Sequence, residues 1–116
     1  MINLSNLACW NYIRNLNMSK VYIVNKSAHD FHNAEKFGNL IFMSEGRLNR
    51  FGTNDMMRKF SDAMRNSKEE DYLLPCSLNT ANIMAAVVFA NKHKRLNLLL
   101  FKPSTGEYIE RVHVLD

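Results

Sequence analysis

The sequence is short of the residues that build several classes of protein. Its 116 residues include two cysteines, too few for the disulfide framework of a small secreted domain, so we expect reduced thiols in a cytoplasm. The longest apolar run, Ile83–Ala90, falls far short of the roughly 18 residues that a membrane span needs. The four glycines form neither G-x-x-x-x-G-K nor G-x-G-x-x-G. We therefore expect a soluble protein without nucleoside triphosphate chemistry.

What is present indicates one ordinary folded domain with a small positive charge. The chain is 47% hydrophobic and 22% charged, which is too apolar for a disordered protein, and its length suits a single core. Lys and Arg number 15 against 11 Asp and Glu, for a net charge of +4. No extended basic helix or stripe of the kind that binds DNA is evident. A small anionic ligand fits this charge better than a long polyanion.

The chain divides into a short extension and a body. Met18-Ser19-Lys20, followed directly by a strand-like run, resembles a natural protein start. We therefore place an α/β domain at residues 18–116 and an N-terminal extension at residues 1–17. The extension lacks the continuous apolar core of a signal peptide, so a signal peptide is not expected. Its apolar residues recur at helical spacing, so it forms either an amphipathic helix or a disordered tail.

The pattern of the body predicts alternating strands and helices. Apolar and β-branched runs predict strands at residues 21–24, 40–43, 71–76, 96–101 and 108–115. Helices are expected from a cap at Asp30 to Phe37, from a cap at Thr53 or Asn54 through Met64, and from a cap at Ser77 or Asn79 to about His93. The last helix is apolar nearly all round and should be covered on most sides. We expect an α/β fold with a mixed, mostly antiparallel sheet of about five strands and two or three helices.

Residues that could carry catalysis do not combine into a known pattern. His29-Asp30-Phe31-His32 could bind a metal or transfer protons, but no further ligand spacing supports a metal site, and Asp30 capping a helix is the simpler interpretation. Ser77 lacks the glycines of a nucleophile elbow, and Cys76 has no neighbouring base. We predict no catalytic residue, no metal site and no cofactor.

The junction at residues 71–82 offers binding chemistry instead. The start of its helix presents Asn79 and Asn82 beside free backbone N–H groups, which suits an anion. Tyr72 offers a ring for base stacking, unless it belongs to the core while Asn79 merely caps the helix. Asn82 lies on an apolar helix, so its amide needs either a backbone or a ligand partner. Arg47 and Arg111, within two groups of basic residues, could clamp phosphate or could simply be solvated.

Several segments together resemble a known family, the first described class of phage Thoeris anti-defence proteins. They are Val21–Val24 with Ala28–Phe31, Ala34–Gly38, Ser44–Gly46, Asp71–Leu74 and His93–Leu100, and the resemblance spans about residues 20–115. It implies a sponge in the cytoplasm of the infected bacterial host, which binds cyclic ADP-ribose isomers without degrading them and so blocks immune signalling. It also implies dimers, hexamers built from dimers, and in some members a separate site for cyclic di- or trinucleotides.

The resemblance suggests roles for particular residues. An aromatic residue on a strand and an asparagine ten positions later hold the nucleotide in this family, and Tyr72 and Asn82 match that spacing. Arg47 is similar in placement to a phosphate-contacting arginine. Our leading hypothesis is a non-enzymatic sponge that uses Tyr72, Asn82, Arg47, Arg111 and Asn79. The alternatives are a nucleotide hydrolase or phosphodiesterase using His29, Asp30 and His113, and an inhibitor that acts by binding a protein.

Overall fold

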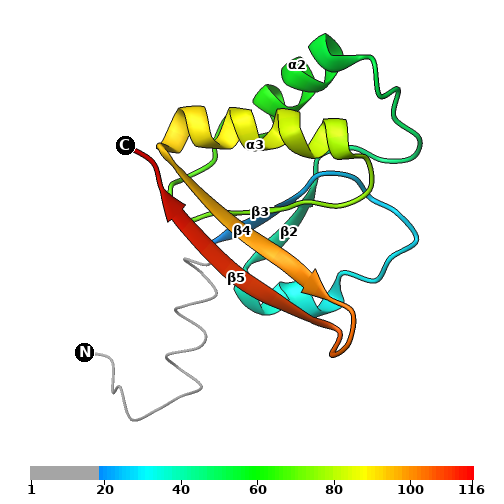
Figure 1. The fold of residues 1–116 in the computed structure, drawn as a ribbon, viewed down its shortest axis with the longest axis vertical. Coiled ribbons are helices and arrows are strands. Elements are labelled where there is room, and N and C mark those ends of the chain that lie inside the picture. Colours follow the sequence, from blue (N-terminus) through cyan, green and yellow to red (C-terminus); the bar gives the residue numbers. More distant parts are fainter. Residues whose placement is uncertain (1–18) are drawn as a thin grey trace.

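The computed structural model describes residues 19–116 and shows strands and helices in alternation, followed by a hairpin (Figure 1). The elements are β1 (Lys20–Ile23), the 3-10 helix η1 (His32–Phe37), β2 (Asn39–Phe42), α2 (Thr53–Ala63), β3 (Tyr72–Leu74), α3 (Asn79–His93), β4 (Arg95–Lys102) and β5 (Glu107–Val114). The predicted α/β class, the five strands and the helix count are thus confirmed. No helix in residues 19–116 combines the length and apolarity required to cross a membrane. The extension predicted at residues 1–17 lies outside the described residues.

The five strands form one mixed sheet in the order β2-β1-β3-β4-β5. The pairs β1–β2, β1–β3 and β3–β4 are parallel, and only β4–β5 is antiparallel. The expectation of a mostly antiparallel sheet is therefore wrong for three of the four pairings. The reason is that η1, α2 and α3 each occupy a crossover, which returns the next strand in the same direction. Only the four-residue turn at residues 103–106, between β4 and β5, reverses the chain.

The direction of strand addition changes beside β1. The chain passes from β1 outward to β2 and then returns to place β3 on the other side of β1. In open sheets with parallel strands, the loops that follow two such strands diverge and leave a crevice at their carboxyl ends. The fold therefore prepares a ligand position at the ends of β1 and β3.

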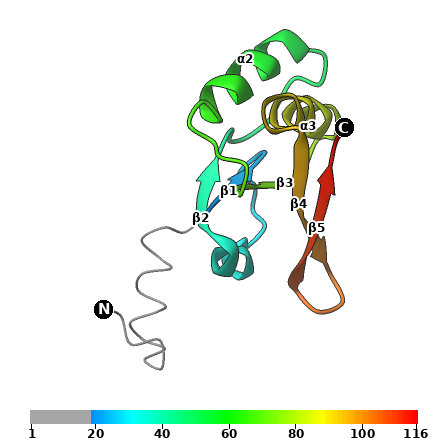
Figure 2. The same ribbon diagram turned by 90° about the vertical axis from the view of Figure 1, so that its left-hand side faces the viewer.

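The helices cover the sheet from both sides. Figure 2 shows α2 and α3 above the strands and η1, drawn in cyan, below them. Alternate residues of β1 point to the two layers, with Tyr22 and Val24 packed under α2 and α3, and Val21 and Ile23 packed against η1. Met56, Phe60 and Met64 of the α2 segment are buried at the predicted spacing. The spacing of these three residues places them on one face of the helix.

The ends of the helices differ from the predicted caps. The predicted cap Asp30 lies one residue before the N-cap of η1, Phe31, and its Oδ1 accepts the N–H of His32, the first residue of η1, at 2.9 Å. The predicted caps of the other helices are wrong: α2 follows Gly52, α3 follows Leu78, and neither position supplies a side-chain cap. Asn79 instead lies inside the first turn of α3. The predicted coverage of α3 is also incomplete, since Ile83 and Val87 remain exposed.

The hairpin joins the rest of the sheet through few backbone contacts. All eight residues of β4 pair with β5, whereas only one pair, Leu73 with Leu98, joins β3 to β4. The buried side chain of Asn97 adds hydrogen bonds where the backbone pairing between β3 and β4 is short. Asn97 Nδ2 donates to the carbonyl oxygens of Glu69 at 2.6 Å and Asp71 at 2.8 Å. The β4–β5 hairpin is thus held to the sheet largely by this amide and by packing.

Candidate functional site

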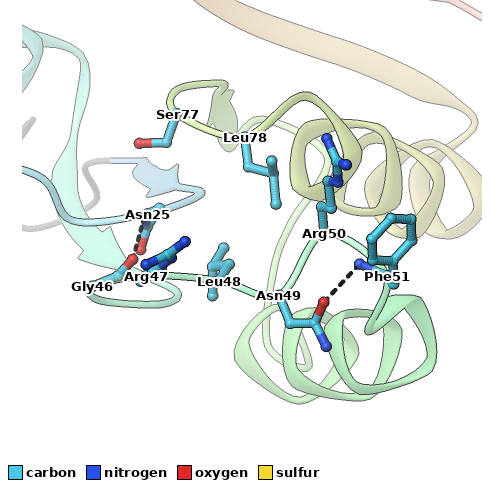
Figure 3. Close-up of a pocket in the computed structure, with 9 residues that line it drawn as sticks. All are labelled: Asn25, Gly46, Arg47, Leu48, Asn49, Arg50, Phe51, Ser77 and Leu78. Atoms are coloured by element: carbon cyan, nitrogen blue, oxygen red, sulfur yellow. Dashed lines mark hydrogen bonds between the residues drawn. The ribbon is translucent and has the colours of Figure 1, made fainter.

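A groove of about 1010 Å³ lies at the carboxyl ends of the parallel strands, where the order of the sheet predicts a crevice. Asn25 follows β1, residues 46–51 connect β2 to α2, and Ser77 and Leu78 connect β3 to α3. The full lining consists of Asn25, Gly46, Arg47, Leu48, Asn49, Arg50, Phe51, Ser77 and Leu78 (Figure 3). Three loops that are distant in sequence therefore form one surface.

A buried polar network fixes the first two loops. Asn25 Nδ2 donates to the Gly46 carbonyl oxygen at 2.9 Å, and Ser44 Oγ lies 2.6 Å from the Val24 carbonyl oxygen and 3.0 Å from Asn25 Oδ1. Asn25 and Ser44 are each only 6% exposed. Gly46 has a φ of +80°, which glycine adopts without steric cost. The wall of the groove is thus set in place before any ligand arrives.

The third loop is tied down by Asn82. Its Oδ1 accepts the Cys76 N–H at 3.0 Å, and Cys76 Sγ donates to the Asn25 carbonyl oxygen at 3.2 Å. Burial raises the pKa of the Cys76 thiol, which keeps it protonated and able to donate. Ser77, the next residue, has a φ of +64°, an unusual value for a side chain other than glycine. The partner that Asn82 needs is therefore backbone, and Asn82 shapes the turn beside the groove.

The electrostatic character of the groove is positive. Arg47 and Arg50 are exposed, and neither forms an ion pair within residues 19–116. The N-terminus of α3 opens beside Leu78 with no side-chain cap and no acidic residue in its first turn, so its partial positive charge is not offset there. The lining contains no Asp, Glu or His. This combination favours an anion.

The two arginines stand at different ends of the groove. In Figure 3, Arg47 lies with Asn25 and Ser77 at one end, and Arg50 lies with Phe51 at the other. The apolar side chains of Leu48 and Leu78 occupy the space between them. A ligand that spans the groove would therefore meet a cation, an apolar middle and then an arginine beside an aromatic ring.

Tyr72 lies elsewhere. It pairs in register with Val21, whose side chain packs on the η1 side of the sheet, and its ring meets Phe37 with centroids 5.7 Å apart. Its hydroxyl donates to the carboxylate of Glu110. Asn82 belongs to α3, on the other side of the sheet. The structure does not bring Tyr72 and Asn82 together within one chain.

The other two predicted ligand residues also lie outside the groove lining. Arg111 is exposed on β5, where its Nη1 donates to the Glu110 carbonyl oxygen at 3.0 Å. Asn79 is exposed at the first position of α3, next to Leu78. Of the five predicted residues, only Arg47 lines the groove, and Asn79 and Asn82 lie near it.

The residues considered for hydrolysis are dispersed. His29 Nε2 lies 3.0 Å from the Tyr108 hydroxyl, and its ring packs edge-on against Phe101 with centroids 4.5 Å apart. His113 pairs with Leu96 near the opposite end of the hairpin, on the other face of the sheet. Among residues 19–116, no cluster of three or more His, Cys, Asp or Glu could hold a metal ion. His29 acts here in packing, and Asp30 accepts a backbone N–H at the start of η1.

Sequence reasoning did not single out Asn25, Asn49 or Phe51 as site residues. A usable signal existed, since Asn25 directly follows a buried strand and Gly46 and Gly52 bracket the loop that carries both arginines. Such loops after parallel strands are where ligand contacts gather. Recognising them required the parallel pairing, which the sequence analysis did not predict.

Comparison with known proteins places the chain in a family. No curated protein and no solved structure matches it. The model of one family, described as Phage Pam3 gp32-like protein, matches residues 12–114. This match covers nearly all of the described domain and extends into the preceding segment. The chain therefore belongs to the Pam3 gp32-like family of phage proteins.

Proposed function

We propose that this phage protein binds a small nucleotide anion, a cyclic ADP-ribose isomer, in the groove and sequesters it without degrading it. Sequestration would block immune signalling in the cytoplasm of the infected host. The observation that carries the proposal is the groove itself, in which Arg47, Arg50 and the uncapped start of α3 adjoin one space that no carboxylate lines.

The dimensions and lining of the groove suit a ligand of this class. Its volume of about 1010 Å³ lies at the upper end of the range typical of small-molecule sites, roughly 300–1,000 Å³. Leu48 and Leu78 supply apolar contact, and the arginines and amides supply specific polar contact. Arginine is suited to phosphate because its planar fork presents two parallel N–H donors.

The lining favours binding over hydrolysis. General acid–base catalysis requires a group that exchanges protons near the working pH, placed within hydrogen-bond reach of the reacting atoms. The lining contains no His, Cys, Asp, Glu, Lys or Tyr, the residues that usually act as general acids or bases. His29, Asp30 and His113 lie on other parts of the molecule. A signal bound here would therefore be held rather than cleaved.

The Thoeris resemblance supplies the choice of cyclic ADP-ribose isomers, and with it an assembly of several copies. We propose that the protein forms dimers or hexamers, in which a second chain could bring Tyr72 and Asn82 to one ligand. Two features support self-association. The edge strand β5 has no partner on its outer side within residues 19–116, and Val112, Val114 and Leu115 are exposed along it.

A ligand-recovery experiment tests the proposal. The full chain is mixed with cyclic ADP-ribose isomers or with cyclic di- and trinucleotides, freed of unbound ligand, and then heated to denature it. Mass spectrometry of the released ligand should show an unaltered cyclic ADP-ribose isomer, recovered from the parent and from an Arg58→Ala control. A hydrolysed product, or no captured nucleotide, would overturn the sequestration proposal.

A further inference from the structure

Phe51 is the most exposed of the large hydrophobic side chains in residues 19–116. Its side chain is 77% exposed, compared with 73% for Val114 and 39% for Phe42. Local hydrogen bonds hold this arrangement: Asn49 Oδ1 accepts the Phe51 N–H at 3.0 Å, and the Asn49 carbonyl oxygen accepts the Gly52 N–H at 2.9 Å. The turn therefore presents an aromatic ring to solvent in a defined place, at the rim of the groove.

An arginine accompanies this ring. The guanidinium carbon of Arg50 lies 4.8 Å from the centroid of Phe51, within the range of a cation–π contact. Aromatic rings and arginine planes are the surfaces on which nucleic-acid bases stack when they lie outside a duplex. Arg50 covers one face of the ring, so the other face can accept a planar group.

Other aromatic side chains are less suited to this role. Tyr72 is engaged by Phe37 and Glu110, and His29, Phe101 and Tyr108 pack against one another. None of these residues lines the groove. Phe51 is the one aromatic residue in the lining, and Figure 3 places it at the end opposite Arg47.

We infer that Phe51 is a base-stacking platform, so that the groove recognises a nucleotide by its base at the Phe51 end and by its phosphates toward Arg47. This inference rests on the proposed function, since it assigns the two ends of the same groove to two parts of its ligand. Leu48 and Leu78 lie between these ends and would contact the ribose region. Phe51 then determines whether the groove distinguishes a nucleotide from a bare phosphate anion.

Calorimetric titration with two probes tests the assignment. Cyclic ADP-ribose carries both base and pyrophosphate, whereas inorganic pyrophosphate carries only the charge. Phe51→Ala should weaken binding of cyclic ADP-ribose roughly 5- to 150-fold, the loss expected from one stacked base, and leave pyrophosphate binding unchanged. Phe51→Trp should keep the affinity for cyclic ADP-ribose, and Ile83→Ala, at an exposed position of α3 outside the groove lining, should behave as the parent does.

The outcomes separate this inference from the proposal beneath it. If the parent binds cyclic ADP-ribose and Phe51→Ala binds it equally well, the stacking assignment is wrong while the proposed function stands. If Phe51→Ala weakens both probes equally, Phe51 shapes the loop instead of stacking on a base, and the assignment is also wrong. If the parent binds neither probe, the proposed function itself fails. Thermal unfolding of each variant verifies that the fold is retained.

Discussion

The groove and the η1 face of the sheet both contain polar and aromatic residues, but these side chains have protein partners on the η1 face and are exposed in the groove. On the η1 face, Tyr72 is paired with Glu110, and His29 is packed among aromatic rings and lies against the Tyr108 hydroxyl. In the groove, Arg47 and Arg50 form no ion pair within residues 19–116, and Phe51 projects into solvent. Side chains that already bond or pack within the fold stabilise the structure, whereas exposed side chains in loops at the strand ends are available to bind a ligand.

This difference explains why residue type alone misdirects the search for a site. Tyr72 and Asn82 have functional groups that bind nucleotides well. In the fold, however, Asn82 holds a backbone turn, and the Tyr72 hydroxyl on β3 donates to Glu110 on β5, two strands away. Buried polar groups are almost always engaged in this way. The comparison predicts that changes in the groove alter binding and that changes outside it alter stability.

The largest expected effect is on binding, in the double variant Arg47→Ala/Arg50→Ala. A charge-assisted hydrogen bond from Arg47 to phosphate contributes about 1.5–3 kcal/mol, and the contact of Arg50 with the Phe51 ring about 0.5–1 kcal/mol. We therefore expect a loss of at least about 30-fold in affinity for cyclic ADP-ribose. Isothermal titration calorimetry measures it. Arg58→Ala, which removes an exposed arginine of α2 beside Asp55, is the matched control. Unchanged affinity in the double variant would contradict the groove as the ligand site.

Asn82→Ala should mainly destabilise the fold. The variant leaves the Cys76 N–H without its partner, at an expected cost of about 1–3 kcal/mol in the free energy of unfolding. Urea denaturation followed by circular dichroism measures this change. Asn91→Ala, at an exposed position of the same helix, should be nearly neutral. Equal midpoints for the two variants would show that the amide does not tie down the turn.

Tyr72→Phe should have a small effect, of about 0.5–1 kcal/mol on stability. It removes the hydroxyl that donates to Glu110 but keeps the ring against Phe37. Affinity for cyclic ADP-ribose should stay within twofold of the parent if one chain supplies the whole site. A loss of tenfold or more with an intact fold would instead place Tyr72 at the ligand.

The smallest effect concerns pH and the packed side of α3. Burial, aided by the charge of Lys92, lowers the pKa of His93 below its usual value of 6.5. Because the unfolded chain then binds a proton more readily, protonation destabilises the fold, and stability should fall as the pH drops below about 6.5.

Thermal unfolding from pH 7.5 to 5 measures this slope. His93→Gln should make it shallower, whereas Asn91→Gln, which changes an exposed and non-titrating residue of α3, should leave it unchanged. The same slope in both variants would remove His93 as its source.

The sequence predicted the elements of the fold better than their assembly. The strands at β1, β2, β4 and β5 and the buried stripe of α2 were located to within about two residues, because apolar periodicity is a local property. The direction of pairing is not local. A helix between two strands allows the second strand to run parallel to the first. The sequence analysis predicted a helix at each crossover but did not infer parallel pairing from it.

The candidate site was predicted only in part for the same reason. Arg47 was predicted to contact phosphate and lines the groove. Asn25 and Phe51 were not predicted, since only the parallel sheet brings their loops together. Asn82 was correctly expected to require a partner, and backbone and ligand could not be distinguished from sequence. The partner is 6 residues away, in a turn whose shape depends on Ser77 at positive φ.

The single backbone pair between β3 and β4 divides the sheet into two parts that should differ in amide exchange. Amides of β4 that face β5 belong to a continuous ladder, whereas those that face β3 depend on the Leu73–Leu98 pair and on the side chain of Asn97. Deuterium should therefore enter along the β3–β4 seam before it enters the hairpin. The hairpin would then open from the domain as one unit while keeping its own hydrogen bonds.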